Sequence, residues 1–177
     1  AAGAEKSIVI IGHDAEQMRE YLGDSVEYAE QKERLGTGHA VMQARDFIEK
    51  HKGDDIVVLN GDGPMIDAET LTKAYNYHKE NNNSITLISA LVDDTDGIGH
   101  IKRDENGKLE RIIEHKDATE EEKKINESNA GFYWFNGNDL LYALDRITNN
   151  NAQNEYYITD SLEILISAGK NAGAYVV

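Results

Sequence analysis

Leu35-Gly36-Thr37-Gly38-His39-Ala40 is the stretch from which the fold can be read. It follows a short extended run, 26–31, and opens a helical pattern with apolar residues at Ala40, Val41, Ala44, Phe47 and Ile48. We expect Thr37 to cap this helix and the two glycines to keep its first turn free of side-chain bulk. Because the first N–H groups of a helix lack intrahelical partners, the turn can receive a polar ligand. The alternative is an ordinary capped turn, where glycine and threonine are common.

Apolar runs and amphipathic stretches alternate on both sides of this turn. Strands are predicted at 7–11, 26–31, 56–60 and 85–91, with helices at 14–22, from Thr37 onward and at 68–82. Such alternation is typical of a parallel α/β sheet.

The second half of the sequence follows a different pattern. Asp104-Glu105-Asn106-Gly107 predicts the turn of a hairpin between 100–103 and 108–114. Beyond it we expect a charged helix at 118–127, a strand at 129–135, helices at 137–147 and 157–168, and a strand at 174–177. Without repeats or Pro-rich linkers, one domain over 1–177 is the simplest interpretation.

Composition narrows the function. The 177 residues carry a formal net charge of −15, which argues against nucleic-acid or anionic-membrane binding as the main role. The chain has no cysteine, no apolar run long enough to span a membrane and no signal-peptide pattern, so we expect a cytoplasmic protein. A phosphate ligand would need backbone N–H groups, placed cations or a divalent metal to overcome the acidic background.

Polar residues follow the predicted strands, at the edge where open α/β sheets bind ligands. Gln31 ends the second strand, and Asn60, Gly61 and Asp62 end the third. As a carboxylate at a strand end, Asp62 can share Mg²⁺ with a phosphate. The alternative is a tight turn in which Asp and Gly serve the backbone geometry.

Further candidates lie around the hairpin and beyond it. The glycines of 97–99 either let backbone approach a ligand or make a turn. Glu114 and Lys116 share a face, so they either bind sugar hydroxyls and phosphate or form a surface ion pair. Asn129 either bonds a sugar or ends the preceding helix. The stretch 151–160 is either a substrate loop or a helix cap with tyrosine rings packed on the core.

Six segments together resemble one family, the uridyltransferase domain of the bacterial bifunctional N-acetylglucosamine-1-phosphate uridyltransferase/glucosamine-1-phosphate acetyltransferase. They occur in family order and span most of the chain, at 31–40, 60–64, 97–101, 113–118, 127–131 and 151–160. The resemblance implies an α/β, Rossmann-like nucleotidyltransferase fold. Its sheet would be mixed and mostly parallel, with helices on both faces and a β-hairpin insertion.

The resemblance also implies a reaction, in which N-acetylglucosamine-1-phosphate attacks the α-phosphorus of UTP in line and expels pyrophosphate. The product would be UDP-N-acetylglucosamine for cell-wall synthesis, and the cofactor Mg²⁺. By this resemblance Gln31 reads uracil, Gly36 and Thr37 lie beside the base, and Asn60, Gly61 and Asp62 follow ribose and phosphates, with Asp62 on the metal. Gly99, Glu114, Asn129 and Tyr157 would hold the sugar side, and Lys116 and Asp62 would be catalytic. The longer parent would be a homotrimer through a β-helix.

The sequence also departs from the family pattern. The family's first strand, its Gly-rich loop with a basic signature and a following lysine have no counterpart here, nor does a later metal-sharing asparagine. That first strand normally lies between the strands at 7–11 and 56–60, so its absence is expected to expose two apolar strand edges or to leave a gap between them. Gly63, Met65 and Ala130 replace the usual Val, Leu and Thr. We therefore expect this chain alone to be inactive or weak.

Two other functions stay open. One is a related sugar nucleotidyltransferase that uses glucose-1-phosphate or dTTP, and the other is a non-catalytic sugar-nucleotide-binding fragment. In either enzyme reading, we expect Gln31, Gly36, Asp62, Glu114 and Asn129 to converge on one cleft rim.

Overall fold

The strands form two separate sheets in the computed structural model, which describes residues 3–12, 15–61, 63 and 66–177. A parallel pair is made by β1 (Ile8–Ile11) and β2 (Glu27–Glu30). The second sheet has six strands, in which β3 and β5 pair with β7 along one edge and β4 pairs with its other edge. Its strands are β3 (Asp55–Leu59), β4 (Ile85–Leu91), β5 (His100–Arg103), β6 (Leu109–Ile113), β7 (Glu127–Asn136) and β8 (Ala172–Val176).

The predicted α/β class with a mixed sheet and a hairpin insertion is confirmed. The expectation of mostly parallel pairing needs correction. Strands β3 and β4 do run in the same direction, but β7 lies between them and is antiparallel to both. Parallel ladders in the described residues are β1 with β2 and β4 with β8. The sequence did not reveal this because strand order is set by long-range pairing, not by local periodicity.

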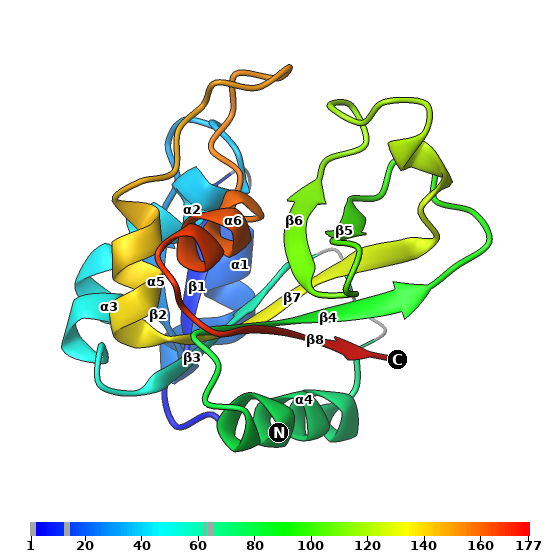
Figure 1. Ribbon diagram of the computed structural model, residues 1–177. Coiled ribbons are helices and arrows are strands. Elements are labelled where there is room, and N and C mark those ends of the chain that lie inside the picture. The colour runs from blue at the N-terminus through cyan, green and yellow to red at the C-terminus, as the bar shows by residue number, and fades with distance from the viewer. Residues whose placement is uncertain (1–2, 13–14, 62, 64–65) are drawn as a thin grey trace.

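Helices cover both faces of the large sheet, as predicted (Figure 1). Helix α4 packs on one face through a small core of Leu71, Ala74, Ile88, Phe132 and Trp134. Helices α2, α3, α5 and α6 pack on the other face around the larger core, which includes Leu87, Tyr133, Phe135, Leu140 and Leu162. The helices are α1 (Ala15–Leu22), α2 (Thr37–Gln43), α3 (Arg45–Lys50), α4 (Ala68–Glu80), α5 (Gly137–Leu144) and α6 (Asp160–Ser167).

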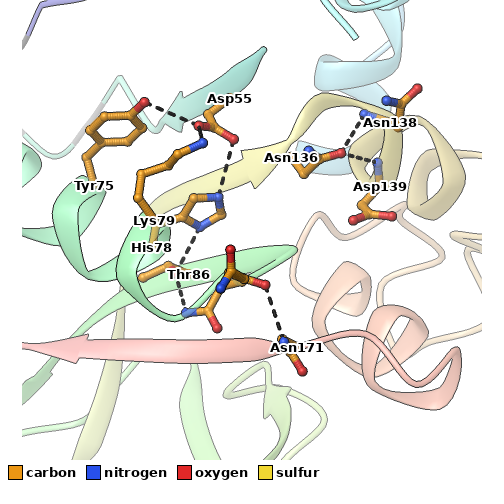
Figure 2. Close-up of polar contacts among 11 residues, drawn as sticks. Asp55, Tyr75, His78, Lys79, Thr86, Asn136, Asn138, Asp139 and Asn171 are labelled. Atoms are coloured by element: carbon orange, nitrogen blue, oxygen red, sulfur yellow. Dashed lines mark hydrogen bonds and ion pairs between the residues drawn. The ribbon is translucent and has the colours of Figure 1, made fainter. Parts of the chain in front are cut away.

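A polar network anchors α4 to the start of β3 (Figure 2). Lys79 Nζ donates to Asp55 Oδ2 over 2.7 Å, and His78 Nε2 lies 3.6 Å from Asp55 Oδ1. His78 is 1% exposed, and its Nδ1 lies 3.0 Å from the Thr86 hydroxyl on β4. Burial is the main reason that the pKa of His78 is lowered, so the neutral imidazole is favoured here. The network thus joins α4, β3 and β4 on one face of the sheet.

Three local predictions were wrong. Thr37 does not cap α2: the N-cap position is Gly36, and no side chain caps this end. The helical pattern from Ala40 to Ile48 is broken at Ala44, where α2 gives way to α3. The charged helix expected at 118–127 is only a 3₁₀ turn, Glu122–Lys124, because strand β7 begins at Glu127. That stretch has charges at helical spacing but too few apolar residues to hold it against a core.

The strands at 8–11 and 55–59 do not pair with each other, as expected from the sequence. The edges of β1 and β3 that face away from β2 and β7 have no ladder partner within the described residues.

Across the same part of the chain, no helix is both long and apolar enough to cross a bilayer.

Candidate functional site

The candidate site lies at the edge of β7 where its pairing with β5 ends and its pairing with β3 begins. Strand β3 pairs with β7 from Phe132 onward, and β5 pairs with it at Ser128, so residues 129–131 lie between the two neighbours. The Asn129 N–H donates to the Gly99 carbonyl over 2.8 Å, and the Asn60 N–H donates to the Gly131 carbonyl over 3.3 Å. At this break in the β7 ladder, which we call the opening, three predicted site residues, Asn60, Gly99 and Asn129, lie along one strand edge.

The Gly36-Thr37-Gly38 turn packs against the segment 155–158. The Gly38 N–H donates to the Tyr156 carbonyl over 2.7 Å, and the Tyr156 N–H donates to the Leu35 carbonyl over 2.7 Å. Gly36 has φ +103°, and a Cβ there would lie 2.5 Å from the Tyr156 carbonyl oxygen. The Thr37 hydroxyl accepts from the Ile158 N–H over 3.1 Å instead of capping α2. The two glycines are therefore required by a close approach of two backbones.

Gln31 is fixed beside this turn. Its Nε2 donates to the Gly36 carbonyl over 3.1 Å and lies 3.1 Å from His39 Nδ1. These contacts engage the amide nitrogen and orient the side chain, so its carbonyl oxygen can be presented to a donor on a ligand.

Glu114 and Lys116 both bond to the stretch 151–160. Thr159 Oγ1 donates to Glu114 Oε1 over 2.8 Å, and Lys116 Nζ donates to Gln153 Oε1 over 2.5 Å. The surface ion pair considered for Glu114 and Lys116 is therefore not what holds these side chains. Gln153 Nε2 also donates to the Tyr157 hydroxyl over 2.6 Å, while the Tyr157 side chain is buried. The buried tyrosine of the second sequence interpretation is confirmed, no side chain caps α6, and a role of this stretch as a substrate loop stays a prediction.

Asn129 lies within β7 and does not end a helix. Its Nδ2 donates to the buried Tyr133 hydroxyl over 2.6 Å, and its Oδ1 accepts from the Gly131 N–H over 3.2 Å. Burial raises the pKa of Tyr133, with a smaller contribution from the Glu114 charge.

Several acidic side chains lie near Asp160 and Glu114. The pKa of Asp160 is raised to about 6, first by burial and then by the charges of Glu114, Glu163 and Asp117. A carboxyl group whose pKa is shifted by burial and by neighbouring charges is a common feature of functional sites, although structural clusters shift pKa values as well. Asp160 also lines a surface hollow of about 500 Å³ between α5 and α6, with Tyr142, Arg146 and Glu163.

The strand predicted at 56–60 is followed by a segment, 61–65, of which the structure describes only residues 61 and 63. Asn60 and Gly61 follow β3, and Gly63 packs against the Phe132 ring, but Asp62 and Met65 lie outside the described residues. In the described part, no three His, Asp or Glu side chains gather in a metal-binding group. Mg²⁺ is commonly held by one or two carboxylates plus substrate phosphates and water, so the donor chemistry of one strand-end carboxylate fits this metal.

Contacts link several of the predicted residues in a series that we call the rim, while Asn60, Gly99 and Asn129 are joined along the β7 edge. Gln31 contacts Gly36, Thr37 contacts Ile158, and the adjacent Thr159 contacts Glu114. Sequence reasoning assigned no individual role to Thr159, Gln153, Tyr133 or His39, which hold the predicted residues in place. The polar and aromatic composition of 151–160 pointed to the segment that contains Thr159 and Gln153, whereas no local sequence pattern indicated a role for Tyr133 or His39.

Comparison with known proteins agrees with this fold. The sequence profile of the nucleotidyl transferase family matches residues 1–177. The Bifunctional protein GlmU of Acetivibrio thermocellus is 48% identical over 176 residues, which are 99% of this chain and 38% of that protein. The Bacillus subtilis protein of the same name is 43% identical over 170 residues, 96% of this chain and 37% of that protein. The chain therefore spans less than two fifths of the length of these relatives.

A solved structure from Bacillus anthracis, described as a glucose-1-phosphate thymidylyltransferase, superposes with a TM-score of 0.74. It is 19% identical and covers 96% of this chain and 67% of its own, so it supports the fold alone. From its sequence profile, its relatives and its architecture, the chain belongs to the nucleotidyl transferase family, and it resembles the first part of the bifunctional GlmU proteins.

Proposed function

We propose that this chain is the uridyltransferase part of a GlmU-type protein. In the longer protein, this part would bind UTP and N-acetylglucosamine-1-phosphate in the opening between β3 and β5, where the uridylyl group is transferred to the sugar phosphate. The main support is the series of contacts from Gln31 to Gly36 and from Thr37 through Ile158 and Thr159 to Glu114, which brings amide, backbone and carboxylate groups into one linked set. Phosphoryl transfer depends on positioning and charge neutralisation more than on a covalent nucleophile, and this rim has the groups for positioning.

In this proposal the chain binds the two halves of the product at opposite ends of the rim. Gln31 presents its amide to uracil beside Gly36 and Thr37, while Asn60, Gly61 and Asp62 follow the ribose and phosphates. Beside Gly99, the Glu114 carboxylate accepts hydrogen bonds from sugar hydroxyls and the Asn129 amide donates to them. Tyr157 supports this side through its hydrogen bond with Gln153. Lys116 supplies a cation to the transferred phosphate, which matters in a chain of net charge −15.

Mg²⁺, when bound, would neutralise charge on the nucleotide phosphates, with Asp62 as its proposed ligand on this chain. Cytoplasmic location and trimer formation by the longer protein belong to the same proposal.

Isothermal calorimetry with UDP-N-acetylglucosamine, UDP-glucose and dTDP-glucose tests the binding, and pyrophosphate release from UTP or dTTP tests the turnover. We expect UDP-N-acetylglucosamine to bind most tightly, and Glu114→Gln to weaken its binding about tenfold or more, since a charged acceptor for the sugar hydroxyls is lost. The 177-residue chain is also expected to bind this product while releasing pyrophosphate slowly or not at all. Preference for dTDP-glucose would favour the alternative nucleotidyltransferase, and no binding of any sugar nucleotide would reject the proposal.

A further inference from the structure

A bulge in β7 coincides with the opening. Residues 130–132 of β7 lie opposite the single residue Ile88 of β4, because the register of the two strands shifts at this point. In a regular strand, residues four positions apart are separated by about 13 Å and their side chains point in parallel directions. The bulge shortens this separation between Asn129 and Tyr133, so the amide of one side chain reaches the hydroxyl of the other over 2.6 Å.

Gly131 shapes the bulge at its centre. It has φ +77°, a left-handed conformation that side chains disfavour. A Cβ at this position would lie 2.5 Å from Asn60 Nδ2, so the absence of a side chain also leaves room for the Asn60 amide. Two amide side chains of the opening, Asn60 and Asn129, are therefore placed by the same bulge.

The partners of Asn129 decide which way its amide faces. The Gly131 N–H can only donate, so it meets Oδ1, over 3.2 Å, and Nδ2 turns to the Tyr133 hydroxyl. The backbone of Asn129 is fixed as well, because its N–H donates to the Gly99 carbonyl over 2.8 Å. An asparagine amide nitrogen has two hydrogens, and the second one is left for a ligand. Since Asn129 is only half-buried, a ligand can reach this N–H.

The Tyr133 hydroxyl is held in place by the core around its ring. Tyr133 is 1% exposed, and it pairs with Val58 of β3 on one side and Leu87 of β4 on the other. Its ring centroid lies 6.0 Å from that of Phe135, where a ring without a hydroxyl fills the core. A buried hydroxyl without a partner would cost stability. What the hydroxyl of Tyr133 adds is a fixed acceptor for the Asn129 amide.

We propose that Tyr133 is a positioning residue for the sugar side of the site. Its hydroxyl holds the Asn129 amide, across the β7 bulge, in the orientation that directs one N–H to the sugar. Without the hydroxyl, the amide keeps its contact with Gly131 but rotates more freely, so part of the sugar contact is lost. The inference rests on the proposed function, because that function assigns Asn129 to the sugar.

Calorimetry of Tyr133→Phe with two ligands tests the proposal. UDP-N-acetylglucosamine carries the sugar, whereas UDP shares its nucleotide half and lacks the sugar. We expect the variant to bind UDP-N-acetylglucosamine about three- to tenfold more weakly than the native chain, the range of one hydrogen bond, and to bind UDP within about twofold. Unchanged binding of the sugar nucleotide, or an equal loss for both ligands, would overturn the proposal.

A double-mutant cycle with Asn129→Ala shows whether the hydroxyl acts through Asn129. In the Asn129→Ala background, Tyr133→Phe should change the affinity for UDP-N-acetylglucosamine by less than about twofold, because the amide that the hydroxyl holds is gone. An undiminished loss in that background would contradict the proposal, since Tyr133 would then act on the ligand by another route.

Tyr75→Phe is the matched control. The Tyr75 hydroxyl donates to Asp55 Oδ2 over 3.3 Å in the network between α4 and β3, outside the site. This variant also loses one hydroxyl and one hydrogen bond, yet it should bind both ligands like the native chain. A loss confined to UDP-N-acetylglucosamine in Tyr75→Phe as well would count against a specific role of Tyr133.

If the native chain binds no sugar nucleotide, the proposed function fails, and NMR of the free protein tests the positioning by itself. The Nδ2 hydrogens of Asn129 should exchange slowly with water in the native chain, because one of them is bonded to a buried hydroxyl. Tyr133→Phe should shift their signals and speed their exchange, whereas Tyr75→Phe should leave both as they are. Unmoved Asn129 signals in Tyr133→Phe would refute the inference.

Discussion

At the residue scale, Gly36 is the site residue that is least able to accept a substitution. Gly36 combines a positive φ with a backbone carbonyl where a Cβ would lie, so an alanine there must displace the 155–158 segment. Because that segment holds Thr159 and Gln153 against Glu114 and Lys116, strain at Gly36 reaches the sugar side of the rim.

We expect Gly36→Ala to lower the free energy of unfolding by about 2 to 4 kcal/mol, from backbone strain and the overlap with Tyr156. Urea denaturation followed by circular dichroism measures this. Gly53→Ala is the matched control, because a Cβ at Gly53 meets nothing within 4 Å, and it should change stability by less than about 0.5 kcal/mol. Equal effects of the two substitutions would contradict the packing argument.

Asp160 is the residue whose charge opposes folding. Its pKa of about 6 lies above the ordinary value of 3.8, so the folded chain retains a proton that the unfolded chain has already lost. Stability therefore falls as pH rises from about 4 to about 6 and is constant above that range, as far as this group is concerned.

Asp160→Asn should accordingly raise the free energy of unfolding by about 1 to 2 kcal/mol at pH 7, after allowance for partial solvent screening. The gain should shrink towards pH 4, where the native carboxyl is protonated in both states. Denaturation curves at the two pH values measure the difference. A gain that did not depend on pH would point to packing and not to charge as the cause.

At the element scale, Asp55 joins β3 to helix α4. One carboxylate meets Lys79, Tyr75 and His78 from the same helix, and its side chain is only 10% exposed (Figure 2). Removing the charge leaves a half-buried network without its central acceptor.

Asp55→Asn should lower the free energy of unfolding by about 1 to 3 kcal/mol. Asp54→Asn, one residue earlier, is a close control, because Asp54 is 71% exposed and meets only the His51 ring among these pairs. That variant should stay within about 0.5 kcal/mol of the native chain. Thermal unfolding of the two variants side by side decides whether the network or the general loss of an acidic charge matters.

The whole molecule consists of a well-packed six-stranded sheet and a small two-stranded one. In β1 only Ile11 is buried, and β2 and α1 contribute no buried residue, whereas β4 and β7 are buried along most of their length. A two-stranded sheet with so little core is only marginally stable by itself.

Hydrogen exchange should therefore separate the two sheets. The amides of β1 and β2 are expected to exchange by local opening, about tenfold or more faster than those of β4 and β7, which exchange through global unfolding. Mass spectrometry of peptides from 8–11, 27–30, 85–91 and 127–136 gives the comparison. Equal protection of both sheets would show that the smaller one is held by contacts beyond its own core.

Local pattern was enough to predict most elements of this protein. The apolar runs within 7–11, 56–60 and 85–91 and the Asp104–Gly107 turn identified strands and a hairpin, because side-chain burial and turn geometry follow from neighbouring residues. Family resemblance then collected the candidate residues, of which Asp62 lies outside the described part of the structure.

The tertiary structure decided what local pattern does not encode. The placement of β7 between β3 and β4 made the pairing antiparallel, and the start of that strand at Glu127, whose carboxylate meets Arg103 and Ser89, ended the expected helix at 118–127. The same long-range packing placed Gly36 and Gly38, at the start of α2, against the segment 155–158, and brought His115 to Asp96. Propensity and periodicity act over a few residues, whereas register and burial depend on partners far apart in the chain.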